Sequence, residues 1–337
     1  MSKHLRIWLF VLLGTLLTFT SLLAQGVITM TTSEGVGEEI GLSIKANGNV
    51  TIEGAQETGK TDKFDRKSYR LTSQTITIRG DVTELYCYFN KLTSLDVSKN
   101  AALTELNCSF NQLISLDVSK NTALTKLYCF GNELTSLDVS KNTALTTLVC
   151  SSNQLTSLDV SKTTALRKLD CCCNQLTSLD VSKNIALTEL DCRENQLTSL
   201  DVSKNAVLTT LACSWNQLTS LDVSKNIALT ELRCSYNRLT SLDVSKNIAL
   251  TLLDCCNNKL TSLNLSECTR LVTLYCYSNC INGKAMTKLV NSLSNRRKKK
   301  SGTIFLVDRY SERRDKNKYS AAHVATARKK NWEVRQY

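Results

Sequence analysis

Apolar and polar residues alternate along most of this chain in a pattern that returns every 21 residues. One copy, residues 124–143, reads LTKLYCFGNELTSLDVSKNT. Alternation of this kind is typical of strands that bury one face. Each copy therefore divides into two half-turns, one built on LTKLYC and the other on LTSLDV. The side chains predicted to point inward are those of Leu124, Leu127, Cys129, Leu134, Leu137 and Val139.

About ten copies follow one another between residues 81 and 282. Burying the six apolar side chains of a copy stabilises it by about 1.5–3 kcal/mol each, whereas ordering its 21 residues costs about 1–2 kcal/mol per residue in backbone entropy. One copy cannot fold alone, so the copies must stack and bond to one another. The sequence predicts a β-rich solenoid whose turns lie about 4.8 Å apart. Each copy has one cysteine at the same place, and stacking would align these residues in a column; we call them the ladder cysteines. They are at 87, 108, 129, 150, 171, 192, 213, 234, 255 and 276, and an asparagine follows each of them three residues later.

The repeat has the form Leu-x-x-Leu-x-(Leu/Cys)-x-x-Asn-x-Leu, and a period of 20 to 29 residues with this form is the signature of leucine-rich repeats. Stretches such as LDCRENQLTSLDVSKN at 190–205 resemble the repeats of the internalin J-like group of bacterial surface proteins, which carry a cysteine ladder at this position. The tract 281–337 is similar to the C-terminal cap of secreted leucine-rich-repeat proteins of Gram-negative bacteria. These resemblances imply a surface-exposed, adhesion-type binding role.

The N-terminus has the pattern of a secretory signal peptide over residues 1–25. Lys3 and Arg6 precede an apolar run at 7–23, and Ala24 follows as a small residue before a cleavage point. The alternative is an uncleaved anchor, although 17 residues is at the short limit for spanning a bilayer. We therefore expect a secreted or cell-surface protein, either extracellular or associated with an outer membrane.

The two flanks of the repeat region predict caps. Residues 26–80 contain short alternating runs, VITMTT, IGLSIKA, NVTIEG and QTITIRG, which indicate strands of an N-terminal β cap that covers the open edge of the solenoid. Residues 283–337 break the period. Helical spacing in GKAMTKLVNSL and SAAHVATARKKN, each followed by a strand-like run, predicts a C-terminal α/β cap.

The charge is concentrated in this second cap. The chain carries a net charge of +12, and residues 283–337 hold 16 Lys/Arg against 4 Asp/Glu, so residues 1–282 have no net charge. The basic run consists of Arg296, Arg297, Lys298, Lys299 and Lys300. It favours contact with an acidic surface polymer, while the simpler interpretation is a solvated loop. Specific nucleic-acid recognition is not expected.

The chain has 15 cysteines. Ladder cysteines on successive turns would stand about 4.8 Å apart, whereas a disulfide requires Cβ atoms about 3.8 Å apart, so buried free thiols are predicted. Zinc is not expected in the ladder, because its ligands would form a line rather than converge. Cys268 and Cys280 are candidates for a disulfide, and Cys172 and Cys256 are predicted to face solvent. The cysteines outside the ladder are 172, 173, 256, 268 and 280.

Polar columns in the repeat suggest structural uses. The asparagine after each ladder cysteine suits a chain reversal and tolerates a left-handed backbone. A second asparagine column is interrupted by Thr163 and Cys268, where we expect local irregularity. A column of aspartates raises the alternative of bound calcium, but the Gly-rich calcium-binding repeat is absent, which favours a structural role. The second asparagine column is at 100, 121, 142, 184, 205, 226 and 247, and the aspartates are at 96, 117, 138, 159, 180, 201, 222 and 243.

Catalysis is not predicted. The only histidines are His4 and His323, so no nucleophile has an evident imidazole partner. We expect no enzyme activity, no cofactor and no metal.

The LTSLDVSKN half of the repeat hardly varies, whereas the half around the cysteine is diversified at its outward positions. All ten aromatic residues between 81 and 282 lie beside or just after a ladder cysteine. Exposed aromatic residues are typical interface anchors, although ring stacking that only stabilises the sheet is the alternative. We predict binding of a host or bacterial surface protein or glycan through this face. An alternative function is an envelope spacer docked through the basic cap. The predicted partner-binding residues are Tyr86, Tyr88, Phe89, Phe110, Tyr128, Phe130, Arg193, Glu194, Trp215, Arg233, Tyr236, Tyr275 and Tyr277.

Overall fold

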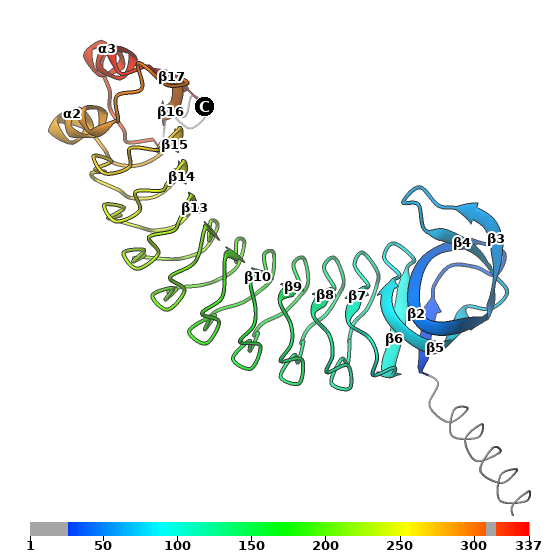
Figure 1. Cartoon of the computed structure of the whole chain (residues 1–337). Coiled ribbons are helices and arrows are strands. Elements are labelled where there is room, and N and C mark those ends of the chain that lie inside the picture. The colour runs from blue at the N-terminus through cyan, green and yellow to red at the C-terminus, as the bar shows by residue number, and fades with distance from the viewer. Residues whose placement is uncertain (1–25, 308–314, 337) are drawn as a thin grey trace, which may run out of the picture. The chain divides into compact units, whose positions relative to one another are not determined.

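A computed structural model describes residues 26–307 and 315–336 (Figure 1). The predicted signal peptide, 1–25, lies outside the described residues. The chain forms two compact units, which divide between Leu124 and Thr125.

The first unit holds the N-terminal cap and the first two turns of the repeat. β1 pairs with β5 and β6, β2 with β4 and β5, and β3 with β4, all antiparallel, while β5 pairs with β7 in parallel. The cap sheet therefore continues into the parallel ladder, where Leu85 faces Leu106. The strands are β1 (Val27–Thr32), β2 (Glu39–Glu53), β3 (Ala55–Thr61), β4 (Lys67–Leu71), β5 (Thr75–Tyr86), β6 (Leu92–Lys99) and β7 (Glu105–Asn107).

The alternating runs of the cap were predicted well, with two differences. VITMTT forms β1 and QTITIRG begins β5, but IGLSIKA and NVTIEG join into the single long strand β2. The polar segments 55–61 and 67–71 form β3 and β4, which the sequence did not predict because they carry few apolar residues.

The second unit is a stack of turns, each with one three-residue strand. Its strands are parallel and in register, so that Leu169 pairs with Leu190, and Leu190 with Leu211. Figure 1 shows the strands following one another along the inner side of this stack. The β-rich solenoid is confirmed. The strands are β8 (Lys126–Tyr128), β9 (Thr147–Val149), β10 (Lys168–Asp170), β11 (Glu189–Asp191), β12 (Thr210–Ala212), β13 (Glu231–Arg233), β14 (Leu252–Asp254) and β15 (Thr273–Tyr275).

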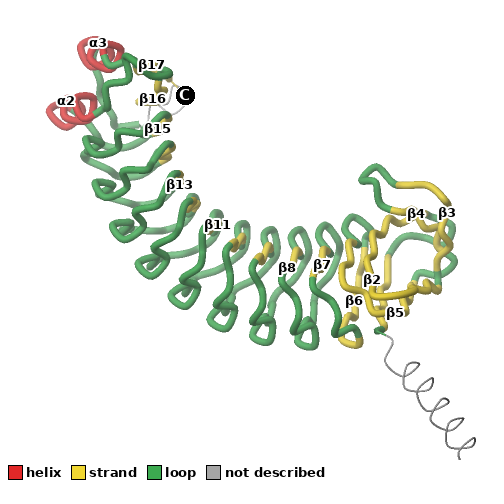
Figure 2. The backbone as a smooth tube through the Cα atoms, in the orientation of Figure 1, coloured by secondary structure: helices red, strands yellow, loops and turns green. Residues whose placement is uncertain are grey.

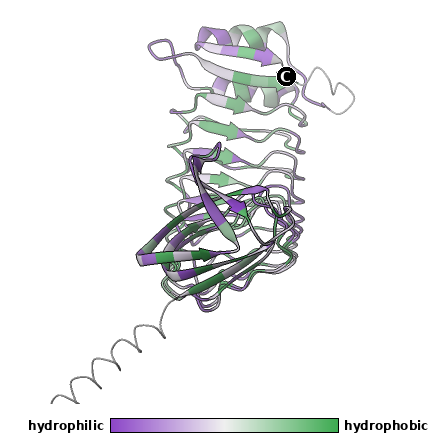
Figure 3. Cartoon of the chain, turned by 90° about the vertical axis from the view of Figure 1, so that its right-hand side faces the viewer, coloured by the Kyte–Doolittle hydropathy of each residue, from purple (hydrophilic) through white to green (hydrophobic). Residues whose placement is uncertain are grey.

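The core consists of the columns that the alternation predicted. Leu127, Cys129, Leu134 and Val139 are fully buried, and Leu137 is 7% exposed. Hydrophobic segments recur from one turn to the next (Figure 3). The second half-turn was wrongly expected to be a strand in every copy. Only β6 is one, and in the later copies the same residues form turns that still direct Leu and Val inward (Figure 2).

The asparagine after each ladder cysteine bridges adjacent turns. The Asn153 Nδ2 atom donates to the carbonyl oxygens of Cys150, at 3.1 Å, and Cys129, at 3.0 Å. Its Oδ1 atom accepts from the backbone N–H of Leu134 at 3.0 Å. The side chain satisfies backbone groups that would otherwise be buried without partners, which supports the structural interpretation.

The second asparagine column makes similar bridges. Asn205 Nδ2 donates to the carbonyls of Val181 and Asn184 at 3.1 and 2.9 Å. The irregularity expected at Thr163 and Cys268 was wrong. The backbone N–H groups of Thr163 and Cys268 donate to the carbonyl oxygen three residues earlier, at 3.1 and 3.0 Å. Asn205 makes the same backbone bond at 3.0 Å, so the turn keeps its shape without an asparagine side chain.

The aspartate column closes small turns at the surface. Asp180 Oδ1 accepts from the backbone N–H of Ser182 at 2.8 Å, and this bond lowers the pKa of the carboxyl group. The same contact recurs in the other copies, for example at Asp201 and Asp222. Each carboxylate thus has a structural partner in its own turn.

The C-terminal cap was predicted correctly in element type. β16 pairs with β15 and then with β17, both in parallel, and so extends the sheet of the second unit. Among the described residues, no helix combines the length and hydrophobicity needed to cross a bilayer. The elements are α2 (Gly283–Ser292), β16 (Gly302–Val307), α3 (Ala321–Lys329) and β17 (Trp332–Gln336).

All 15 cysteines lie among the described residues and are free thiols. The ten ladder cysteines are fully buried, as predicted. Cys268 and Cys280, the candidates for a disulfide, are not bridged. Cys256 was wrongly predicted to face solvent. It is 2% exposed because Tyr277, in the same column of the next turn, lies against it and hydrogen-bonds its thiol.

Candidate binding face

The variable face consists of the residues one before, one after and two after each ladder cysteine. In each three-residue strand the middle leucine is buried, so its neighbours point away from the core. On β11, for example, Leu190 is 1% exposed while Glu189 is exposed and Asp191 is half-buried. The repeat thus presents one changing surface on an almost constant core.

The second residue after the ladder cysteine has a left-handed backbone in every turn. The angle φ is 54° at Phe89, 52° at Phe110, 58° at Trp215 and 52° at Tyr236. Glycine occurs here only as Gly131, with φ of 66°. For other residues this conformation costs roughly 1–2 kcal/mol, and a bulky side chain in it is unusual.

The left-handed conformation had been associated with the asparagine that follows, which was wrong. The chain reverses one residue earlier. The reversal turns the asparagine side chain inward, where Asn216 Nδ2 donates to the carbonyls of Cys192 and Cys213 at 3.0 and 3.2 Å. The preceding residue, Trp215, points outward and is 53% exposed.

In the first unit, aromatic rings gather beside the cap. Phe89 stacks on Phe110 with ring centroids 4.2 Å apart and on Phe64 at 5.3 Å. Tyr88 meets Phe64 edge to face at 5.4 Å. Sequence reasoning missed Phe64, because it comes from the loop between β3 and β4 and no periodic pattern links it to the repeat.

Arg66 fixes this aromatic cluster to the cap. Its guanidinium carbon lies 4.0 Å from the ring centroid of Tyr88, and its Nη1 donates to the Tyr88 carbonyl. Nη2 pairs with Asp62 Oδ2 at 2.6 Å. The guanidinium is buried and fully engaged, so it orients the rings rather than offering a free charge.

In the second unit, Trp215 and Tyr236 form a stacked pair on adjacent turns. Their ring centroids are 3.7 Å apart and the planes differ by 8°. Trp215 remains half-exposed on its outer side, while Tyr236 is shielded more. The pair forms a flat apolar plate on the variable face, and it involves two of the predicted residues.

A charged hollow of about 460 Å³ lies on the same unit over β10 to β13, and its lining includes the small residues Thr210 and Ala212. Ala212 leaves space because the other copies carry larger residues at this position, such as Tyr128 and Arg233. The side chains around the hollow form ion pairs: Lys168 with Glu189 at 3.0 Å, Arg193 with Asp191 at 2.6 Å, and Arg233 with Glu231.

Cys172 lies beside the hollow, between two carboxylates. Its Sγ atom and one oxygen each of Asp170 and Asp191 lie within 4.8 Å of one another. Burial and the two negative charges raise the pKa of the Cys172 thiol. Cys173 Sγ lies 3.6 Å from Cys172 Sγ. Cys172 had been predicted to face solvent, and it is half-buried.

The other predicted aromatic residues are only partly available. Tyr86 donates its hydroxyl to Glu105 at 2.7 Å, and Tyr275 stacks on Phe305 of β16 at 4.5 Å. Tyr277 was wrongly expected outside the core, since it is 5% exposed over Cys256. Tyr128 and Phe130 are half-buried, and Glu194 is exposed.

The basic run is divided by the structure. Arg296 was wrongly assigned to an acidic-surface contact, because it is 5% exposed and bonded to the last turn of the repeat and to the cap. Its Nη1 donates to the carbonyl of Leu271 at 2.7 Å and its Nε to that of Lys300 at 3.0 Å. Residues 297–300 are exposed.

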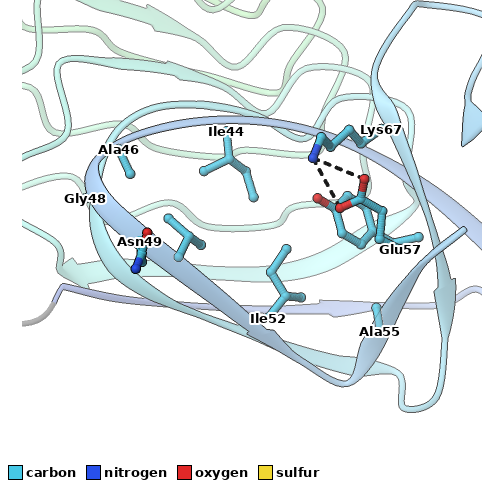
Figure 4. A pocket seen from close by; sticks show the side chains of 10 residues that line it. Ile44, Ala46, Gly48, Asn49, Ile52, Ala55, Glu57 and Lys67 are labelled. Carbon is cyan, nitrogen blue, oxygen red and sulfur yellow. Dashed lines mark hydrogen bonds and ion pairs between the residues drawn. The ribbon is translucent and has the colours of Figure 1, made fainter. Parts of the chain in front are cut away.

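The cap of the first unit contains a separate pocket of about 460 Å³ (Figure 4). Ile44 and Ile52 of β2 project into it, and Tyr69 of β4 is among the residues that line it. Lys67 and Glu57 form an ion pair at 3.1 Å at its rim. The pocket is lined by residues of the cap, and none of them belongs to the variable face.

The one described histidine has a structural position. His323 Nδ1 accepts from the backbone N–H of Ser320 at 3.0 Å and thus caps α3, and its Nε2 lies 2.9 Å from Thr287 Oγ1. The ring links α3 to α2. Among the described residues, no cysteine or serine of the variable face is paired with an imidazole.

The stacked parallel turns, the asparagine bridges and the buried thiols together define a leucine-rich-repeat protein with a cysteine ladder. Residues 143–184 match the family described as Leucine Rich repeats (2 copies). The chain is similar to the functional domain of InlJ from Listeria monocytogenes, which includes a cysteine ladder, with 40% identity and a TM-score of 0.62. The alignment covers 70% of this chain and 52% of the InlJ chain, so this chain spans about half the length of the InlJ domain.

More distant structures share the fold alone. The leucine-rich-repeat protein LIC12759 of Leptospira interrogans has 23% identity and a TM-score of 0.53, and the alignment covers 74% of this chain and 70% of that one. YopM of Yersinia pestis has 22% identity and a TM-score of 0.53, with 71% and 62% covered. A search of curated protein sequences gives no match.

Proposed function

We propose that this chain is an exported binding module, without catalytic turnover, that recognises a surface protein or glycan through its variable face. The observation that carries this proposal is the set of exposed aromatic rings at left-handed positions. Phe89, Phe110 and Trp215 are 48%, 43% and 53% exposed, although their backbone conformation favours glycine. A residue that is costly both to place and to expose is better explained by a partner than by stability.

The charged hollow supports the same proposal. It lies on the second unit, as does the Trp215–Tyr236 pair, and its ion pairs are partly exposed, with Arg193 at 43%. Interfaces commonly combine rigid aromatic anchors with a polar surround that sets specificity. The face therefore favours a partner with apolar or ring-shaped groups beside charged or hydroxyl groups, as proteins and glycans have.

The proposed location is secreted or at the cell surface. It rests on the signal-like residues 1–25 and on the likeness to InlJ. A solenoid with a continuous, laterally extended sheet is suited to binding rather than turnover. The partner would be a host or bacterial surface molecule, which agrees with an adhesion role.

The second candidate function is an envelope spacer that docks on an acidic polymer. The exposed residues 297–300 favour it, because Arg296 anchors the run to the cap while the following side chains project into solvent. This surface would act through charge alone, so its binding should weaken steeply with salt.

One experiment separates the two candidates. The labelled chain is presented to a glycan array and to host and bacterial cells, together with Trp215→Ser/Tyr236→Ser, Lys298→Ser/Lys299→Ser/Lys300→Ser and the control Ile227→Ser. Ile227 is also an exposed apolar residue, at 61%, but lies off the variable face. We expect the aromatic double variant to lose at least about tenfold in affinity, which corresponds to about 1.4 kcal/mol, and the control to bind normally. Normal binding by the double variant would contradict the proposal, and loss only in the lysine variant would favour the spacer.

A further inference from the structure

Three side chains that can ligate a metal meet on the variable face of the second unit, and a fourth lies next to one of them. Asp170, Cys172 and Asp191 each bring one ligand atom within 4.8 Å of the others, and Cys173 Sγ lies 3.6 Å from Cys172 Sγ. The first three side chains are half-buried. No other group of three or more such side chains occurs among the described residues.

The repeat brings these ligands together through its register. Asp170 ends β10 and Asp191 ends β11, and the two are direct partners in the parallel ladder. Cys172 directly follows the ladder cysteine Cys171, and its thiol points to the side on which Asp170 and Asp191 lie. In the comparable turn, Asp254 and Cys256 have Tyr275 where a second carboxylate would be required, so the set is incomplete there.

We infer that Asp170, Cys172, Cys173 and Asp191 bind one zinc ion. A tetrahedral zinc with bonds of about 2.3 Å to sulfur places two thiolates about 3.8 Å apart. The two thiols are already close to this separation, at 3.6 Å. Calcium and magnesium prefer sites made only of oxygen atoms, whereas two sulfur and two oxygen ligands suit zinc.

Arg193 is compatible with the bound ion. It donates from Nε and Nη2 to both oxygens of Asp191, at distances of 2.6–3.0 Å. Asp191 Oδ1 also accepts from the backbone N–H of Arg193 at 3.1 Å, so ligation of the metal by Asp191 would replace one of these bonds; Nε contacts both oxygens and can keep one when the other turns to the metal. Hydrogen bonds of this kind orient metal ligands and make them better donors.

Binding requires loss of two protons. Both thiols are neutral in the absence of metal, so the ion replaces their protons: one Zn²⁺ and two S–H groups give a zinc dithiolate and two H⁺. No oxidant or other reactant is needed. The exchange of two protons for one Zn²⁺ leaves the net charge of the site unchanged, and it places the ion between Asp170 and Asp191, which are partners on adjacent strands.

The sequence analysis did not predict this site, because it considered zinc binding only by the ladder cysteines. The signal is an aspartate before the ladder cysteine in two successive copies, with an additional cysteine after the first. That combination is visible in DCCC at 170–173 followed by DC at 191–192.

The test uses the purified chain, stripped of metal under reducing conditions and titrated with Zn²⁺ and, separately, with Co²⁺. We expect one zinc per chain by elemental analysis, proton release, and a cobalt spectrum with tetrahedral d–d bands and a sulfur-to-cobalt charge-transfer band. Cys172→Ser and Asp191→Asn should weaken zinc binding by roughly 100-fold, while the matched control Cys256→Ser should not change it. Circular dichroism verifies that each variant folds.

Three results would overturn the inference. The first is failure of the wild-type chain to retain zinc, and the second is an octahedral cobalt spectrum without the charge-transfer band. The third is equal loss of zinc in Cys256→Ser and Cys172→Ser. The wild-type cobalt spectrum decides the matter even if a variant does not fold. The test needs no partner, so its failure would leave the proposed binding function standing.

Discussion

The indole ring of Trp215 lies flat on the phenol ring of Tyr236 one turn further along, with centroids 3.7 Å apart. Both residues hold a left-handed backbone, with φ of 58° and 52°. The pair therefore combines an attractive contact with an unfavourable conformation. A stacked pair contributes about 0.5–1.5 kcal/mol, which is similar to the roughly 1–2 kcal/mol cost of one left-handed residue.

Trp215→Asn should consequently change the stability little while it weakens partner binding. Asparagine tolerates the left-handed conformation, so the relief offsets the lost stacking, and the free energy of unfolding should stay within about 1 kcal/mol of wild type. Urea unfolding measures this. A loss of about 3 kcal/mol or more would mean that the ring acts as a structural element, as Phe and Trp do in cores.

The ladder asparagines should be far more sensitive than their surface neighbours. Asn195 Nδ2 donates to the carbonyls of Cys171 and Cys192 at 3.0 and 3.2 Å, and Oδ1 accepts from Leu176 N–H at 2.9 Å. Asn195→Ala leaves these buried groups without partners, so we expect a loss of about 2–4 kcal/mol. The exposed neighbour Gln196 is the control, and Gln196→Ala should cost less than about 0.5 kcal/mol. Chemical denaturation compares the two, and equal effects would contradict the bridging role.

Stability should fall at alkaline pH because the ladder thiols are buried as neutral groups. Burial raises the pKa of Cys213 from 9.0 to about 12. Since the folded pKa is the higher one, the unfolded chain loses its proton first. The stabilisation is complete below about pH 9 and is lost as the pH rises towards 12.

Cys213→Ala isolates this contribution. The variant should be less stable at pH 7, but its stability should fall less steeply between pH 9 and 11, by about 1.4 kcal/mol per pH unit relative to wild type. Urea unfolding across this range gives both slopes. Parallel curves for the two proteins would show that the thiol ionises equally well in the folded state.

Substitution of Arg296 should lower the stability of the protein, whereas substitution of the neighbouring lysines should change only its surface charge. Arg296 bonds two carbonyls and lies 5.7 Å from the Trp332 ring, so Arg296→Ala should destabilise the cap by about 2–4 kcal/mol. Lys299→Ala, at an exposed position, should change the unfolding free energy by less than about 0.5 kcal/mol. Thermal unfolding tests the contrast. Similar effects of both changes would be inconsistent with a buried Arg296.

The core of the fold was predictable because its signal repeats. Alternating Leu, Cys and Val at a 21-residue period requires turns in register, and the columns of buried residues follow from that. The cap elements in 283–337 were also predictable, since helical spacing alternates with short apolar runs. Local periodicity was enough in both cases.

The errors concern contacts between positions that no pattern links. Phe64 reaches Phe89 from the cap, Tyr277 covers Cys256 from the next turn, and Arg296 turns back to Leu271. Each depends on the path of a loop or the rotamer of one side chain. The left-handed conformation was predicted one position too late. The hydrogen bonds of the asparagine side chain, and not its conformational preference, decide where the chain reverses.

Oxidative footprinting of the chain with and without a bound partner is the most direct measurement of whether the variable face is the binding surface. We expect Trp215 and Tyr236 to become protected when the partner binds, while Ile227 and Ile248, which are 61% and 57% exposed off that face, react as before. Protection of the isoleucines with unchanged oxidation of Trp215 and Tyr236 would contradict it.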